Sequence, residues 1–222
     1  MIRFLLVGAS LALMLAACGE ASDAASDAET VAAPEPAPAA AQTGPKQFAA
    51  FPEMVIDQNK TYTAVITTNL GAMTFELLVR ESPLAANNFV FLAREGYYDD
   101  IIVHRSIPRF MAQSGDPTGT GTGGPGYSFE IETPQRPYVR GTLAMANKLA
   151  PNTNGSQFFI IYASLTEQGR LDPSFSLFGQ MTKGEETLAK IEAVPVGLNP
   201  SSGENSRPLQ EIRIASIRIT ES

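Results

Sequence analysis

VHRSIPRFMAQSGDPTGTGTGGPG, residues Val103–Gly126, places a guanidinium, two bulky apolar side chains and an amide close together in the chain. These groups belong to Arg105, Phe110, Met111 and Gln113. Alternate residues of an extended chain point to the same side, so Met111 and Gln113 are expected to share a face. Such a face can hold a small apolar ring and offer hydrogen bonds to the amide beside it. This combination suits a peptide better than a phosphate, a metal or a sugar.

The same stretch resembles the signature of the cyclophilins, the peptidyl-prolyl cis/trans isomerases. The matching residues are His104-Arg105, Ile107-Pro108, Phe110-Met111, Gln113 and Gly115-Asp116. Two further blocks match in the expected order, LAMAN at Leu143–Asn147 and PNTNGSQFFI at Pro151–Ile160. The resemblance runs from about Thr61 to the C-terminus. It implies a mainly β fold, in which a closed antiparallel barrel of eight strands is capped by two α-helices.

Prolyl isomerisation breaks no covalent bond, and its barrier of about 18–20 kcal/mol reflects the partial double-bond character of the amide. An enzyme can lower this barrier by binding the twisted amide more tightly than either planar form. The resemblance assigns the catalytic role to Arg105, whose guanidinium would donate to the substrate carbonyl and toward the prolyl nitrogen. Neither a metal nor a cofactor is needed, and none is expected. His104 is expected to be structural, because the reaction moves no proton.

The resemblance also implies which residues contact the substrate. The apolar pocket for the proline ring matches Phe110, Met111, Phe159 and Leu171. The flanking peptide would be held by Gln113, Ala146, Asn147 (largely through its backbone) and Gln157. Two positions depart from the commonest family pattern. Arg170 stands where many members have the tryptophan associated with cyclosporin binding, so weak binding of that ligand is expected. Phe175 stands where many have histidine, and it keeps the pocket apolar.

The main alternative is a binding module or chaperone with the cyclophilin fold that grips proline-containing segments without significant turnover. Arg105 and the intact apolar pocket favour the enzyme. Activity on a short proline peptide would distinguish the two.

The glycine-rich run contains a literal G-x-G-x-x-G at Gly119, Gly121 and Gly124. A dinucleotide-binding fingerprint should open a helix, whereas Pro125-Gly126 follows here. We therefore expect a tight loop whose glycines adopt positive φ angles.

Hydrophobic patterning predicts the secondary structure around this stretch. A hairpin is expected from Thr61–Thr68 and Met73–Val79, joined by a turn at residues 69–71. A helix should follow, with Ser82 as its N-cap, Pro83 in its first turn and Gly96 after its end.

The C-terminal half is expected to hold further strands at Gly141–Ala146, Gln157–Tyr162 and Ser176–Met181, and a helix over Gly184–Val194. In the last strand, Glu211–Thr220, the apolar residues change from even to odd positions. One extra residue near Ala215-Ser216, a β-bulge, would explain this change.

The N-terminal region resembles a bacterial lipoprotein leader. Residues 1–17 have one early positive charge and a short apolar run, typical of a signal peptide, and Leu15–Gly19 resembles the lipobox. Cys18 would then be lipidated, and an Ala/Pro-rich tether of residues 18–50 would join it to an isomerase domain of residues 60–222. The chain is expected to be exported and anchored to a bacterial membrane. Gly19, rather than Asp, favours the periplasmic face of the outer membrane.

Composition limits the remaining functions. The 222 residues include 23 acidic and 16 basic side chains without a basic run, so nucleic-acid binding is not expected. The single cysteine excludes an internal disulfide, and the single histidine cannot form a zinc site alone. We expect a monomer whose partners are proline-containing segments of exported proteins and, through the lipid on Cys18, a membrane.

Overall fold

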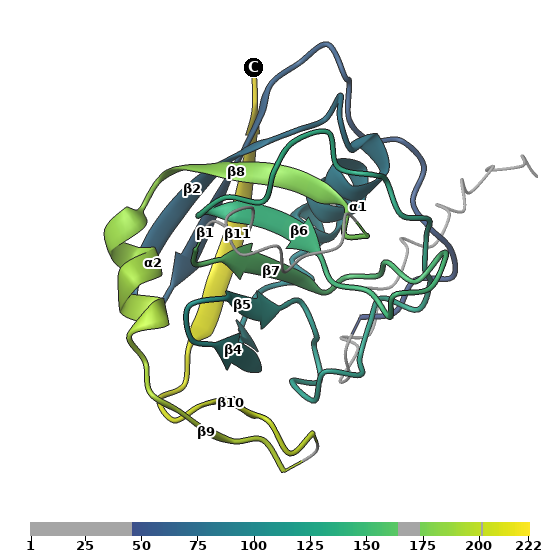
Figure 1. Ribbon diagram of the computed structural model, residues 1–222. Coiled ribbons are helices and arrows are strands. Elements are labelled where there is room, and N and C mark those ends of the chain that lie inside the picture. The colour runs from purple at the N-terminus through teal and green to yellow at the C-terminus, as the bar shows by residue number, and fades with distance from the viewer. Residues whose placement is uncertain (1–45, 164–173, 201) are drawn as a thin grey trace, which may run out of the picture. The chain divides into compact units, whose positions relative to one another are not determined.

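In the part of the chain that the computed structural model describes, residues 46–163, 174–200 and 202–222, nine strands form one antiparallel sheet and two form a separate hairpin (Figure 1). The sheet order is β3-β11-β1-β2-β8-β6-β7-β5-β4, and β9 pairs with β10. The helices are α1 (Pro83–Arg94) and α2 (Glu185–Glu192). The strands are β1 (Tyr62–Thr68), β2 (Gly71–Leu77), β3 (Ile101–Ile102), β4 (Arg105–Ile107), β5 (Met111–Ser114), β6 (Thr142–Met145), β7 (Phe158–Ile161), β8 (Leu177–Lys183), β9 (Val196–Leu198), β10 (Asn205–Pro208) and β11 (Arg213–Glu221).

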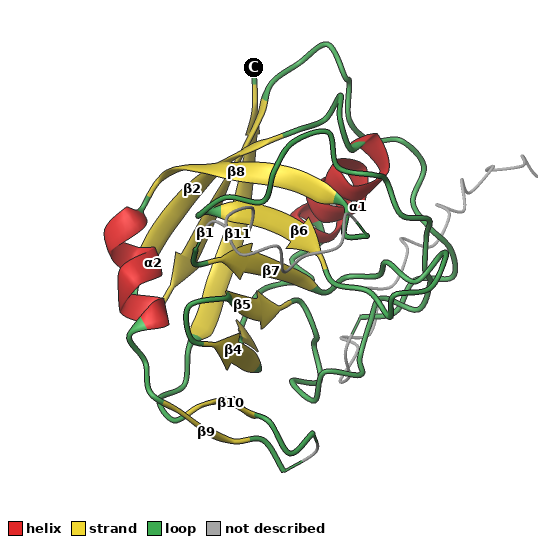
Figure 2. Cartoon of the chain, viewed as in Figure 1, coloured by secondary structure: helices red, strands yellow, loops and turns green. Residues whose placement is uncertain are grey.

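The mainly β fold with two helices is confirmed, but the expectation of a closed barrel of eight strands is wrong. The sheet is a curled half-barrel (Figure 2). The strand order places β3 and β4 at its two edges. Only Val103 and His104 separate these strands in the sequence. One short segment therefore pairs first with β11 and then with β5. Because the segment passes directly from one edge of the sheet to the other, its two halves cannot also pair side by side.

The expected N-terminal hairpin and the bulge in the last strand are both confirmed. β1 pairs with β2 along its whole length. On its other side Thr67 lies opposite Ser216 and Thr68 lies opposite Ile214, so Ala215 is the extra residue of β11. The bulge allows both Ile214 and Ile217 to be buried, although one is even-numbered and the other odd.

The other expected elements occur close to their predicted positions, as β6, β7, β8 and α2. The β9–β10 hairpin, by contrast, was not expected. Among the described residues, no helix is long and apolar enough to cross a membrane.

Helix α1 covers the core side of the sheet and begins differently from the expectation. Its buried Phe89 contacts Phe158 of β7 edge to face at 5.4 Å and Phe178 of β8 at 5.0 Å. Ser82 occupies the N-cap position, but its hydroxyl donates to the Leu177 carbonyl instead of capping the helix. The Glu132 carboxylate caps the helix instead, since it accepts the first-turn N–H groups of Leu84 and Ala85 at 2.8 and 2.9 Å.

Residues that precede position 60 also pack against the core. Phe48 lies 5.0 Å from Phe91, and its N–H donates to the Pro125 carbonyl. Phe51 lies 5.0 Å from Phe129, and Ile56 is buried. The packed structure therefore begins at least twelve residues before the expected boundary (60 − 48 = 12).

The glycine-rich run forms a loop organised by one buried carboxylate, that of Asp116. Its two oxygens accept the Thr118 N–H and hydroxyl, both at 2.7 Å, and the N–H groups of Gly121 and Gly123 at 2.6 and 3.0 Å. Gly119 and Gly121 have φ angles of 67° and 87°, as expected, whereas Gly124, the third glycine of the motif, does not have a positive φ. At Gly123 a Cβ atom would overlap the Asp116 carboxylate, so glycine is required there.

These hydrogen bonds give Asp116 an unusual acidity. Burial by itself would raise the pKa of the carboxyl, but the bonds from Thr118, Gly123 and Gly121 outweigh burial and hold the pKa below its ordinary value. The ionised carboxylate is thus the form that stabilises the loop.

We predict that Asp116→Asn lowers the free energy of unfolding by roughly 1–3 kcal/mol at neutral pH, because one acceptor oxygen becomes a donor nitrogen inside a cage of donors. The unfolded pKa of an aspartate is about 3.9. Since the folded pKa is lower, the carboxylate contributes fully above that value, and its contribution is lost as the pH falls through the folded pKa. Urea denaturation should therefore show a difference between the two forms that shrinks below about pH 4.

Asp99→Asn is the control, because this carboxylate is exposed. This variant should have the same free energy of unfolding as the wild type both at neutral pH and below about pH 4. An Asp116→Asn variant as stable as the wild type at neutral pH would show that the carboxylate does not hold the loop.

Candidate functional site

One face of four neighbouring strands carries four of the ten residues expected to act in catalysis or substrate binding. Arg105 of β4 lies opposite Gln113 of β5, which lies opposite Phe159 of β7, which in turn lies opposite Ala144 of β6. Residues directly opposite one another in a sheet project from the same face. Met111 precedes Gln113 by two residues in β5 and therefore shares this face, as the sequence predicted. The structure thus brings a cation, an amide and apolar side chains together.

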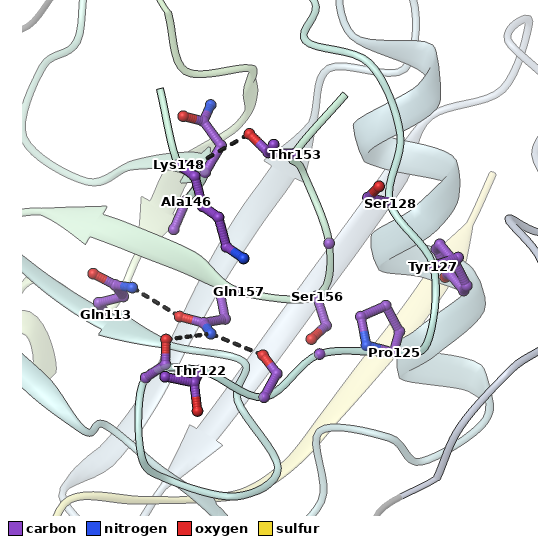
Figure 3. A pocket seen from close by; sticks show the side chains of 15 residues that line it. Gln113, Thr122, Pro125, Tyr127, Ser128, Ala146, Lys148, Thr153, Ser156 and Gln157 are labelled. Carbon is purple, nitrogen blue, oxygen red and sulfur yellow. Dashed lines mark hydrogen bonds between the residues drawn. The ribbon is translucent and has the colours of Figure 1, made fainter. Parts of the chain in front are cut away.

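A chain of hydrogen bonds links the polar residues of this face to the glycine-rich loop. Arg105 Nη1 donates to Gln113 Oε1 at 3.1 Å, and Gln113 Nε2 donates to Gln157 Oε1 at 2.9 Å. Gln157 Nε2 then donates to the carbonyls of Gly121 and Gly123 at 3.0 and 2.9 Å. The close-up in Figure 3 shows the two glutamines facing each other across the strands. Both amides are therefore held in one orientation beside the guanidinium.

The apolar part of the site is a cluster built on the same face. Met111 and Phe159 are almost fully buried, with 2% and 4% of their surface exposed. Phe110, Ala146 and Phe175 pack against the same cluster and remain partly exposed. Partial exposure leaves surface on which a small ring could lie, while the buried pair supports it from below.

Phe175 packs against this apolar cluster from outside the strands. Its ring meets that of Phe159 edge to face at 5.4 Å. The hydroxyl of Tyr138 donates to the Phe175 carbonyl at 2.7 Å and thereby fixes the backbone that carries the ring. Tyr138 is a supporting residue that no local sequence pattern indicates.

A pocket of about 300 Å³ adjoins the polar chain (Figure 3). Gln113, Ala146, Asn147 and Gln157 line it together with residues 121–125. The Asn147 side chain is already engaged, because its Nδ2 donates to the Ser174 carbonyl at 2.8 Å and its Oδ1 accepts the Leu149 N–H. A peptide beside Asn147 would therefore meet its backbone, in keeping with the expectation.

Arg105 has an anionic partner that the sequence analysis missed. Glu204, which precedes β10, accepts from Arg105 Nε at 2.8 Å and from Nη2 at 3.0 Å. The hydrogen bond from Arg105 lowers the pKa of the Glu204 carboxyl. These two residues are 99 positions apart in the chain, and no local pattern links them.

The other residues singled out in the sequence differ in burial, and some lie outside the described residues. His104 is 8% exposed, and within the described residues neither of its ring nitrogens has a hydrogen-bond partner. Burial lowers its pKa, so it is neutral at pH 7. Arg109 is exposed, in the turn that joins β4 to β5. Leu171, Arg170 and Cys18 lie outside the described residues.

Comparison with known proteins agrees with this geometry. The family model described as cyclophilin type peptidyl-prolyl cis-trans isomerase/CLD matches residues 63–219. Peptidyl-prolyl cis-trans isomerase-like 1 of Gibberella zeae is 39% identical over 166 residues, which are 72% of this chain and 96% of that protein. The human isomerase-like 3 is 40% identical over 162 residues, 71% of this chain and 95% of that protein. The isomerase-like 2 of Rhizopus delemar is 41% identical, but the match spans only 29% of that longer protein.

A solved structure shares the fold as well. The cyclophilin type isomerase of Cryptosporidium parvum aligns with a TM-score of 0.65 and 40% sequence identity, covering 73% of this chain and 99% of that chain. From the match over residues 63–219, the identities near 40% and the common fold, we conclude that this chain belongs to the cyclophilin-type peptidyl-prolyl cis-trans isomerase family.

Proposed function

We propose that this chain accelerates rotation about X-Pro bonds by holding the twisted amide beside Arg105, with the proline ring on the apolar cluster. The observation that carries the proposal is the shared sheet face. Arg105 and Met111 are diagonal neighbours across β4 and β5, within reach of a single dipeptide. A donor and an apolar surface that lie this close together match the amide and the proline ring of an X-Pro unit.

The physical step is the loss of amide conjugation. Rotation removes the partial double bond, so the prolyl nitrogen becomes pyramidal and its lone pair becomes a hydrogen-bond acceptor. A guanidinium donor aimed at this nitrogen stabilises the twisted form more than either planar form, which is the condition for catalysis. Gln113 supports this role because its amide oxygen holds Arg105 Nη1 in place. The reaction transfers no proton, and a buried neutral His104 is compatible with a structural role.

The proposed clients are proline-containing segments of exported proteins, and the proposed location is a bacterial membrane surface. Support for both comes from the sequence alone: the signal-like residues 1–17, the lipobox around Cys18 and the Ala/Pro-rich tether. The relatives described above are eukaryotic and carry no argument for or against this anchor. A lipid on Cys18 would keep the isomerase near chains that emerge from the export machinery.

A binding module without turnover is the second candidate. It would need the apolar cluster and the peptide-facing amides, but it would have no use for a fixed guanidinium. The ordered position of Arg105, bonded on two sides, therefore favours the enzyme.

We predict that Arg105→Ala lowers turnover by about two to three orders of magnitude, the usual effect of removing a donor that acts in the transition state. The fold and much of the peptide affinity should remain, because Met111 and Phe159 stay in place. The measurement is isomerisation of a short Ala-Pro peptide in the cold, where the uncatalysed reaction, about 10–100 s at room temperature, is slower still.

Arg109→Ala is the matched control, because it removes the same charge four residues later from an exposed position. It should stay near wild-type turnover. Equal turnover in Arg105→Ala and wild-type protein would refute the arginine mechanism and favour the binding module.

We also predict that Cys18→Ser moves the full chain from the membrane fraction to the soluble fraction of a Gram-negative host. Stable anchoring requires more than one acyl chain, which lipoprotein processing at a cysteine supplies. Because Cys18 is the only cysteine, no disulfide is lost in the variant. Finding the wild type and the variant in the same fraction would contradict the anchor.

A further inference from the structure

The hairpin of β9 and β10 brings an acidic residue onto the proposed catalytic arginine. Glu204 engages one edge of the guanidinium, with Nε at 2.8 Å from one carboxylate oxygen and Nη2 at 3.0 Å from the other. The turn that carries Glu204 is itself bonded, since the Asn199 N–H donates to the Glu204 carbonyl and the Gly203 N–H donates to the Asn199 carbonyl, both at 2.8 Å. These two hydrogen bonds hold the backbone of Glu204 against that of Asn199.

We propose that Glu204 is a positioning residue for the isomerase reaction, which fixes the plane of the Arg105 guanidinium before substrate binds. This inference rests on the proposed function. A two-point contact along one edge of a planar fork sets the rotation of the guanidinium as well as its place. Gln113 holds Nη1 from another side, so Arg105 is held between β5 and the hairpin.

The count of donors shows what remains for the substrate. A guanidinium has five N–H groups. Among the described residues, Glu204 accepts from Nε and Nη2, and Gln113 accepts from Nη1. One N–H on Nη1 and one on Nη2 are left, and these belong to the tip of the side chain. The contacts therefore orient Arg105 and still leave N–H groups free to bind the substrate. A residue that blocked the site would instead occupy all of these donors.

The exposure of the pair suits the same role. The side chains of Arg105 and Glu204 are 33% and 38% exposed, and ion pairs open to water contribute little to folding. Removing Glu204 should consequently leave the fold intact. It should leave the long Arg105 side chain free to move, so that the entropic cost of ordering it is incurred when substrate binds.

The test compares Glu204→Ala, Glu204→Gln and the wild type in the purified full chain. We expect kcat/KM of Glu204→Ala to fall roughly three- to tenfold, the range that ordering one long side chain implies. The affinity for a short Ala-Pro peptide should change little, since the apolar cluster is untouched. Glu204→Gln keeps one acceptor oxygen and should lie between the two.

Two further measurements separate positioning from general damage. Glu211→Ala removes a carboxylate that pairs with Arg213, and it should retain wild-type turnover and thermal midpoint. The Nε–H resonance of Arg105 in NMR spectra reports directly on the two-point contact with Glu204, here called the clamp. The Nε proton should exchange slowly with water in the wild type and rapidly in Glu204→Ala. Equal exchange in the two forms would overturn the clamp whatever the activity.

The outcomes distinguish this inference from the proposed function. If Arg105→Ala is inactive but Glu204→Ala equals the wild type, the positioning role is wrong and the isomerase function stands. A rise in turnover in Glu204→Ala would likewise overturn the positioning role and show that the carboxylate restrains Arg105. If the wild type itself has no turnover, the proposed function fails, while the exchange of the Arg105 Nε–H still decides whether the clamp exists.

Discussion

The site depends on a hydrogen-bonded chain whose direction is fixed at both ends. A guanidinium can only donate, and a backbone carbonyl can only accept. Arg105 at one end and the carbonyls of Gly121 and Gly123 at the other therefore leave Gln113 and Gln157 a single arrangement of oxygen and nitrogen. Reversing either amide would place two donors or two acceptors in contact. Such a chain has one low-energy state, and bonds in series polarise one another. This directionality is what gives the guanidinium a defined place on an open sheet face.

The two ends of the hydrogen-bonded chain are supported by carboxylates that lie far apart in the sequence. Asp116 holds the N–H groups of Gly121 and Gly123, and so anchors the loop whose carbonyls accept from Gln157. At the other end Glu204 holds the opposite edge of Arg105. Two carboxylates thus delimit the polar half of the site, one buried within a loop and one at the surface. Neither would contact a substrate in the proposed mechanism, and both act through the residues that they hold.

One face of the sheet packs in the main core, and the other carries the apolar cluster and Arg105. On one face Phe89 of α1 packs against Phe158 and Phe178 in the main core. On the other, Phe159 belongs to the apolar cluster beside Arg105. Because neighbouring residues of a strand point in opposite directions, Phe158 stabilises the main core while Phe159 supports the apolar cluster on the other face. A reaction that moves no proton needs little more than this: an apolar surface, a donor and enough rigidity to favour a twisted amide over a planar one.

Patterns of short range were readable from the sequence alone. The pairing of β1 with β2, the bulge at Ala215 and the shared face of Met111 and Gln113 all follow from periodicity over a few residues. The likeness to the family added the roles proposed for Arg105 and its neighbours. Tertiary structure decided what depends on distant contacts: the open edge between β3 and β4, the capping of α1 by Glu132, and the pairing of Arg105 with Glu204 across 99 positions. Periodicity records which side of an element is buried. It holds no information about which distant side chain meets it there, because that is fixed only when the whole chain packs.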